Sequence, residues 1–196
     1  YQCGSSQDIR FDADVEDNKL QDSPITEMCR NFCNKIWNAS RFVEMNLDDE
    51  VSLAPPEDLE DPADRWILSL YNRTIESITE SLQAYRFDET SRGIYEFVWN
   101  SYCDWYLEMA KVRLDGQDEE DRRLVQSLLV HVLEGILRMA HPIIPFISEE
   151  LWQKLPHRGD ALILAPWPAC DDTLIDGAAE SRMELLQGVV GAVRNI

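Results

Sequence analysis

The chain has 196 residues, of which 44% are hydrophobic and six are tryptophan, so it can bury a substantial core and is not disordered. Its 37 Asp and Glu residues outnumber its 18 Lys and Arg residues, and the net charge is −19. This charge excludes an overall attraction to nucleic acid, so any such contact must depend on a local basic patch.

The first 23 residues are polar and acidic without a sustained period, and we interpret them as an extended linker. Ser23 followed by Pro24 predicts an N-cap and the first turn of a helix that reaches about Asn46. At 100° per residue, this helix has one apolar side that we expect to pack in the core. That side carries Met28, Cys29, Phe32, Cys33, Ile36, Ala39, Ser40 and Val43.

The opposite side of this helix is the strongest candidate for a binding surface. Between Met28 and Val43 there is no acidic residue and there are three basic residues. Amides, guanidinium groups and an aromatic ring are the groups that read unstacked RNA bases. An ordinary solvated helix face remains the alternative. The polar side carries Arg30, Asn31, Asn34, Asn38 and Arg41, with Lys35 and Phe42 at its edge.

Two further helices are predicted after a proline-containing acidic loop over residues 47–60. Asp61 and Pro62 begin a helix that keeps a helical apolar period to about Tyr85, and we expect it to pack antiparallel to the first. Asp88 is the predicted N-cap of a third helix, which is apolar nearly all round as far as Met109. A helix of that kind belongs in the middle of a bundle.

The last third of the chain predicts a long helix, a short one and a final one. The long helix begins after Asp118 and ends at His141, and Pro145 begins the short helix. Residues 161–164 have a strand-like pattern, and the final helix starts near Asp176. We expect Phe146, Ile147, Leu151, Trp152 and Leu155 to face inward from the short helix. The final helix carries Met183, Leu186, Val190 and Val193, and we expect it to be partly detached from the bundle.

These elements predict an all-α fold, an antiparallel helical bundle of about five main helices with a short extended segment near residues 161–168. We divide the chain into a linker (1–23), the bundle (24–168) and a C-terminal helix (169–196). Because the chain begins without methionine and ends within a helix, we expect it to be a monomeric fragment of a longer protein.

The five cysteines predict neither a disulfide framework nor a zinc ribbon, because they are odd in number and form no CxxC pair. Cys29 and Cys33 are one helical turn apart and could share a metal, but we expect them to pack in the core. No apolar run approaches the roughly 18–20 residues needed to span a bilayer. We therefore expect a cytoplasmic protein without a metal site.

Several segments in chain order carry a resemblance to a known family. They are QDIRFD (7–12), NFCNKIWNASRF (31–42), FDE (87–89), CDWYLE (103–108), HPIIPFISEELW (141–152) and APWP (165–168). Together they resemble the anticodon-binding domain of class I aminoacyl-tRNA synthetases, and the second and fourth are most similar to the valine-specific members. The fifth also recurs in leucine and isoleucine members, so those branches stay open.

The resemblance implies that the partner is tRNA, with valine tRNA as the first choice, beside catalytic and editing domains of the same parent chain. It also implies that the final helix leads toward a coiled-coil arm. The parent would use ATP and Mg²⁺, but the HIGH and KMSKS signatures of its chemistry are absent here, as are P-loop and GxSxG motifs. We expect this segment to hold no cofactor and no catalytic residue.

For the binding surface, our hypothesis is that Asn34, Asn38 and Phe42 form a row that holds one splayed anticodon base. Phe42 would stack on the base, Asn38 would bond its edge, and Arg30 and Arg41 would contact phosphates, with Asn31 and Lys35 as second choices. The resemblance implies the second and third anticodon bases. A helical protein-interaction domain that binds no RNA remains the alternative, favoured by the net charge.

Overall fold

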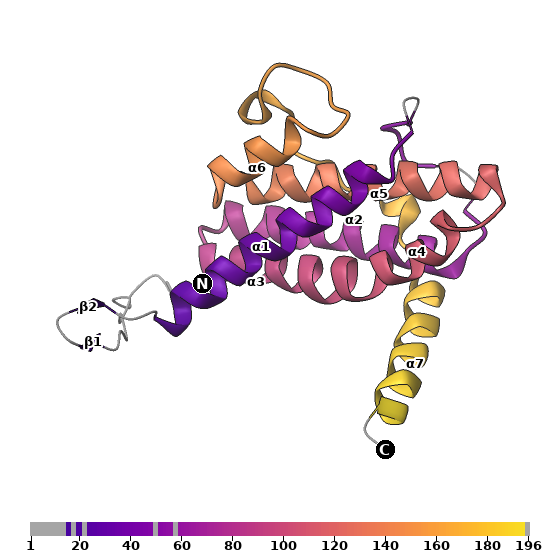
Figure 1. Cartoon of the computed structure of the whole chain (residues 1–196), viewed down its shortest axis with the longest axis horizontal. Helices are drawn as coiled ribbons and strands as arrows, with labels where there is room; N and C mark the ends of the chain where they lie inside the picture. The colour runs from indigo at the N-terminus through magenta and orange to yellow at the C-terminus, as the bar shows by residue number, and fades with distance from the viewer. Residues whose placement is uncertain (1–14, 17–18, 21–22, 49–50, 57–58, 195–196) are drawn as a thin grey trace.

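The computed structural model of the chain describes residues 15–16, 19–20, 23–48, 51–56 and 59–194. Helices pack side by side in a bundle, as predicted, and α7 projects from it (Figure 1). In chain order the elements are β1 (Val15–Glu16), β2 (Lys19–Leu20), α1 (Pro24–Met45), α2 (Pro62–Gln83), α3 (Phe87–Glu96), η1 (Phe97–Tyr106), α4 (Leu107–Leu114), α5 (Glu119–Ala140), α6 (Pro145–Trp152), η2 (Leu162–Leu164), η3 (Asp172–Leu174) and α7 (Gly177–Arg194).

The predicted helix starts are largely confirmed. The carboxylate of Asp61 accepts a hydrogen bond from the amide of Ala63 at 2.7 Å, and that of Asp118 accepts from the first turn of α5. Ser23 precedes α1, but its hydroxyl caps no amide. The prediction for α3 was wrong by two residues, since Arg86 is its N-cap and Asp88 lies in its first turn.

Helix α5 is the centre of the core. Most of its apolar side chains are buried, and α1, α2, α3, α4 and α6 all pack against it. Gly135 lets one of these contacts form, because a Cβ there would lie 1.8 Å from the hydroxyl oxygen of Tyr71. The fully buried residues of α5 include Val125, Leu128, Leu129, Val132, Leu133, Ile136 and Leu137.

The predicted third helix is continuous from Phe87 to Leu114 but changes its winding in the middle. Residues Phe97–Tyr106 form a π-helix, η1, between the α-helical segments α3 and α4. In a π-helix the hydrogen bonds join residues five apart, so such residues come to lie nearly above one another. Residues Trp99 and Asp104 therefore share a side, which an α-helical count does not predict.

Helix α1 lies obliquely across the bundle and contacts η1, α5 and α6 (Figure 1). We expected it to run antiparallel along α2, and this was wrong, since α2 packs mainly against α3, α7 and η1. The contact of α1 with α5 is extended at its end, where the side-chain amide of Gln126 donates to the carbonyl of Asn46 at 2.6 Å.

Two other expectations were wrong in the second half of the chain. Phe146 does not face inward but is 90% exposed, and Ser148 takes the buried position on α6 instead. Residues 162–164 form one 3₁₀ turn, not a strand. From α7, Met183 is buried, whereas Leu186 and Val193 are exposed, because the helix leaves the bundle after its first turns.

Most of the first 23 residues lie outside the part of the chain that the structure describes. The segment 7–12 is among the residues outside it. Within them, Val15 pairs with Leu20 and Glu16 with Lys19 in a short antiparallel hairpin. The proposed division of the chain at residues 23 and 168 stays a prediction. No helix among the described residues is long and apolar enough to cross a membrane.

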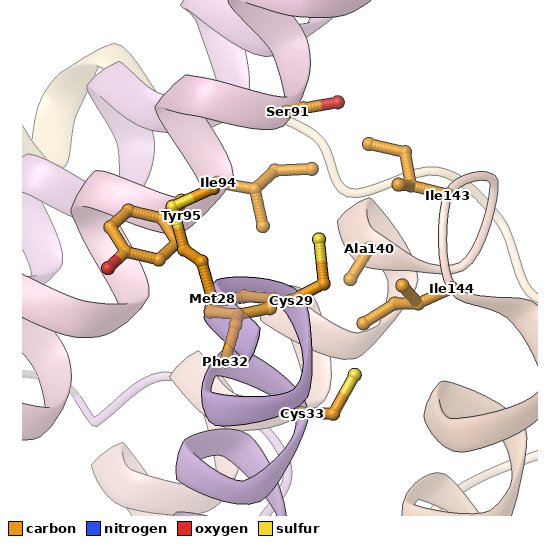
Figure 2. A pocket seen from close by; sticks show the side chains of 10 residues that line it. All are labelled: Met28, Cys29, Phe32, Cys33, Ser91, Ile94, Tyr95, Ala140, Ile143 and Ile144. Carbon is orange, nitrogen blue, oxygen red and sulfur yellow. The ribbon is translucent and has the colours of Figure 1, made fainter. Parts of the chain in front are cut away.

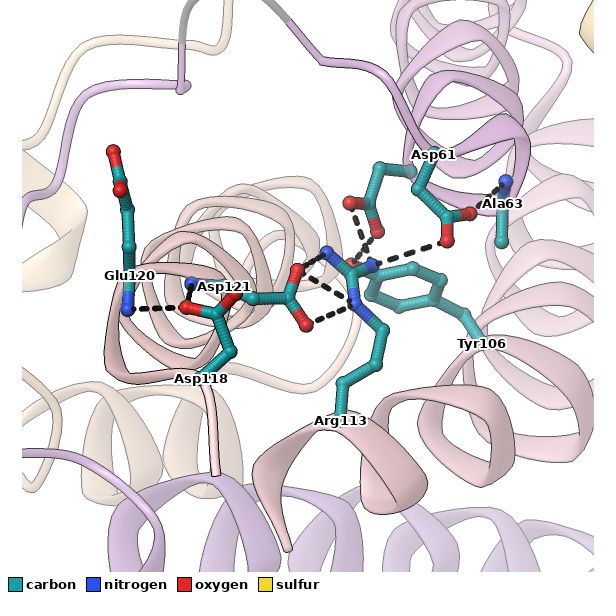
Figure 3. Close-up of polar contacts among 8 residues, drawn as sticks. Asp61, Ala63, Tyr106, Arg113, Asp118, Glu120 and Asp121 are labelled. Atoms are coloured by element: carbon teal, nitrogen blue, oxygen red, sulfur yellow. Dashed lines mark hydrogen bonds and ion pairs between the residues drawn. The ribbon is translucent and has the colours of Figure 1, made fainter. Parts of the chain in front are cut away.

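A buried ionic network joins α2, η1, α4 and α5 (Figure 3). Asp64, whose side chain is 1% exposed, accepts from Nη1 of Arg113 at 2.7 Å and from the hydroxyl of Tyr106 at 2.8 Å. Arg113 also donates from Nε to both carboxylate oxygens of Asp121, at 3.1 and 3.0 Å. The single positive charge of Arg113 thus lies among the carboxylates of Asp61, Asp64 and Asp121, which the packing brings together.

His131 on α5 is a mostly buried group that should make the fold sensitive to mild acid. Its ring packs edge-on against Tyr71, and Nδ1 lies 3.2 Å from the carbonyl oxygen of Leu53. Burial lowers the pKa of His131 below its usual value, although the contact with Leu53 opposes this. Protonation therefore favours the unfolded chain, and the stability present above the unfolded pKa is lost as the pH falls toward the folded pKa.

We therefore expect a lower free energy of unfolding at about pH 5.5 than at about pH 7.5, and a smaller difference in His131→Gln. Urea denaturation followed by circular dichroism measures both values. An unchanged pH dependence in the variant would contradict the assignment to His131.

Candidate nucleic-acid interface

The outer face of α1 is open to solvent. Asn31, Asn34 and Asn38 are exposed, and their side-chain amides make no hydrogen bond to any residue that the structure describes. Arg41 is also exposed, and within the same part of the chain its guanidinium group has no ion-pair partner. These four side chains leave both hydrogen-bonding groups and a positive charge available to a ligand.

The remaining cations of this face already have partners. Nη2 of Arg30 lies 3.4 Å from Oε1 of Glu27, one turn earlier on α1. Nζ of Lys35 lies 2.6 Å from Oδ1 of Asp104 and 4.9 Å from the centre of the Trp99 ring. The π-helical winding of η1 places both of these partners beside Lys35, so this lysine is less available to a phosphate than Arg41 is.

Phe42 is half-buried and packs partly against the core. Nζ of Lys111, on α4, lies 5.7 Å from the centre of its ring, and the same nitrogen lies 2.6 Å from Oε1 of Glu108. Sequence reasoning placed Phe42 on the edge of the polar face but missed its neighbours on α4.

A hollow of about 190 Å³ lies beside Asn38 and Phe42, where α1 meets η1 and α4. Its wall combines the aromatic ring, the exposed amide and two lysines with one carboxylate. Such a hollow offers a base both a ring to stack on and polar groups for its edge. It is lined by Lys35, Asn38, Ala39, Phe42, Cys103, Leu107, Glu108 and Lys111.

The structure thus brings Asn34, Asn38 and Phe42 onto one side of α1, with Arg41 nearby, while their roles stay a prediction. Trp37 is half-buried against the core, and Nζ of Lys154 lies 4.6 Å from the centre of its ring. Lys111, on a neighbouring helix, was missed because its approach depends on the winding of η1. The described residues contain no group of three metal ligands.

Comparison with known proteins gives a consistent family. The model of the anticodon-binding domain of tRNA ligase matches residues 64–196. Valine–tRNA ligases of Bacillus cereus and Bacillus subtilis are each 42% identical, over 97% and 98% of this chain. That of Listeria innocua is 43% identical over 85% of it. The chain spans about a fifth of the length of these relatives, from 19% to 21%.

A solved structure of LeuRS from Agrobacterium radiobacter, in a ternary complex with tRNA and LeuAMS, has the same fold. Its TM-score is 0.60 at 19% sequence identity, and the match covers 77% of this chain and 17% of that one.

Proposed function

Because the chain belongs to the family of anticodon-binding domains of tRNA ligases, we propose that it binds the anticodon loop of valine tRNA along the outer face of α1. The observation that carries this proposal is the set of exposed amides, Asn34 and Asn38, next to the half-buried ring of Phe42 and the exposed guanidinium group of Arg41. The valine assignment rests on the 42% identity to valine–tRNA ligases.

In this mechanism the loop lies along α1 with one base turned out of its stack. The ring of Phe42 stacks on that base, the amide of Asn38 bonds its edge, and Asn34 contacts its neighbour. Arg41 binds a phosphate. Arg30 serves as a second phosphate contact, and its exposed pair with Glu27 opposes this little because such pairs contribute at most about 1 kcal/mol.

We propose that this domain positions tRNA and carries out no chemical step itself. The ligation, with ATP and Mg²⁺, would belong to the catalytic part of a valine–tRNA ligase in the cytoplasm. What supports this division is the absence of the HIGH and KMSKS signatures from the sequence. Within the domain, recognition of the anticodon would contribute to the choice of tRNA.

Arg41→Ala should weaken tRNA binding most at low salt. Each phosphate contact that a cation makes releases counterions, so its loss should reduce the slope of log affinity against log salt by about 0.7–0.9. The measurement is a titration of the complete ligase with valine tRNA at about 50 and about 200 mM salt. Arg182→Ala, an exposed arginine on α7, is the matched control and should leave the slope unchanged.

If both arginine variants reduce the slope equally, the attraction is diffuse and the face of α1 is misassigned. Competition with purified isoleucine and leucine tRNAs separates the valine assignment from its nearest alternatives. A complete ligase that binds no tRNA even at low salt would favour a domain for protein interactions.

A further inference from the structure

The inner side of the first half of α1 borders an apolar pocket of about 130 Å³. Helix α3 forms the opposite wall, and the end of α5 with the turn before α6 forms the third (Figure 2). We expected Cys29 and Cys33 to be core residues, but Cys29 is exposed and Cys33 is half-buried. The pocket is lined by Met28, Cys29, Phe32, Cys33, Ser91, Ile94, Tyr95, Ala140, Ile143 and Ile144.

We propose that Cys29 and Cys33 bind the arsenic atom of a trivalent aryl arsenical, whose aryl group occupies the apolar pocket. Both thiols lie on the wall of the pocket, and in Figure 2 both sulfur atoms lie on the side of α1 that faces Ala140 and Ile144. A dithiol beside an apolar hollow matches the two halves of such a molecule, a thiophilic atom and a flat apolar ring.

The spacing of the pair favours a bridging atom over a disulfide. Residues four apart on a helix have Cβ atoms about 5–6 Å apart. A disulfide needs about 3.5–4.5 Å between these atoms, so it would distort α1. A bridging atom with bonds of about 2.3 Å to each sulfur, as zinc makes, adds the missing length. The two thiols can therefore share one thiophilic atom without a change in the helix.

The choice of arsenic over a metal ion follows from the number of ligands. A structural zinc ion takes four protein ligands, and the described residues hold no group of three His, Cys, Asp or Glu side chains. Arsenic in an aryl arsenical makes three bonds, and its ring already supplies one. Two thiols complete the set, and the apolar wall accepts the ring without desolvating a charge.

The reaction is a ligand exchange without oxidation or reduction. In water an aryl arsenoxide is present as its dihydroxide, with two As–OH bonds. Each thiol forms one As–S bond, and its proton leaves with a hydroxide as water, so one molecule of dihydroxide and two thiols give one dithioarsenite and two waters. Arsenic remains trivalent throughout. We expect Cys29 to react first because it is the more exposed thiol.

Burial and the neighbouring Cys29 raise the pKa of the Cys33 thiol, so ring closure at Cys33 should be the slower step. The other cysteines of the described residues offer no comparable pair. Cys103 is buried and Cys170 lies beside Asp172, with no second cysteine near either in the sequence.

The test treats the reduced full chain with phenylarsine oxide and measures the bound mass. One arsenical per chain should survive an excess of 2-mercaptoethanol and be removed by 2,3-dimercaptopropanol. Cys29→Ser and Cys33→Ser should each lower the apparent affinity by about 10²–10⁴-fold, the usual advantage of two linked contacts. Cys3→Ser, Cys103→Ser and Cys170→Ser are the matched controls and should bind as the wild type does.

Tight binding that persists in Cys29→Ser, or that is lost in Cys3→Ser, would overturn the assignment of the pair. The role of the pocket has its own test, because methylarsonous acid offers the same arsenic without the ring. It should bind at least about tenfold more weakly, since burying a ring contributes well over 1.4 kcal/mol. Equal affinities would overturn the part of the proposal that concerns the pocket.

Discussion

Arg113→Met should lower the free energy of unfolding by about 3–5 kcal/mol, because it leaves a buried carboxylate without its cation. Without the guanidinium group, Asp64 would remain buried with only the hydroxyl of Tyr106 as a partner, and Asp121 would lose its contact as well. Burial already raises the pKa of Asp64, and Arg113 opposes that rise. Urea denaturation at neutral pH measures the loss.

The loss of stability in Arg113→Met should also depend on pH. In the variant, the folded pKa of Asp64 lies further above its unfolded value. The resulting loss in the free energy of unfolding is present at neutral pH and disappears as the pH falls toward the unfolded pKa. Asp121 acts in the same direction, because Arg113 lowers its pKa only in the wild type. The stability difference between the two proteins should therefore narrow as the pH is lowered.

Two controls separate the network from a general effect of charge. Arg123→Met removes an arginine whose side chain is 74% exposed and lies 3.9 Å from Glu119, and it should cost less than about 1 kcal/mol. The double variant Arg113→Met with Asp64→Leu should recover part of the loss, because no uncompensated charge stays at position 64. Equal losses in Arg113→Met and Arg123→Met would contradict the role of the network.

Phe42→Ala should weaken the binding of valine tRNA by about 1–3 kcal/mol, or roughly 5- to 150-fold. The alanine removes the only aromatic ring on the wall of the hollow beside Asn38, and with it the stacking surface for a base. The measurement is a titration of the complete ligase with valine tRNA. Phe42→Trp should retain most of the affinity, since it keeps an aromatic face.

Because Phe42 also packs against the core, the variant needs a control for folding. Asn38→Ala provides this control. Its side chain is exposed, so the variant should weaken tRNA binding without changing the free energy of unfolding. Phe146→Ala removes an aromatic ring that is 90% exposed on α6 and should leave the affinity unchanged. If Phe146→Ala weakens binding as much as Phe42→Ala does, the base does not stack on α1.

Local signals in the sequence predicted the start of most main helices. Pro24 and Pro62 each stand at the first position of a helix, and Asp118 caps α5, because these residues act on backbone groups within one turn. The helical period of the apolar residues likewise predicted part of the core side of α1, where Ile36, Ala39 and Val43 are buried. The same period placed the amides of α1 on the opposite face. They are exposed because none of the described helices covers that face.

The errors arose where the packing of distant segments decides the outcome. A helical count placed Cys29 and Phe146 inside, but the first half of α1 only borders the bundle and the first turn of α6 lies at its surface. The winding of η1 has no sequence period of its own. Its aromatic residues read equally well as an α-helix, and Lys111 could not be placed beside Phe42 without it.

The π-helical segment η1 has a consequence for insertions and deletions in this part of the chain. The direction in which every later residue of the same helix points depends on how η1 is wound. If these ten residues followed the tighter winding of an α-helix, Lys111 would turn away from Phe42 and Arg113 from Asp64. A change of length within η1 should therefore disturb the proposed binding face and the buried charges together, although η1 itself contains neither of these two basic residues.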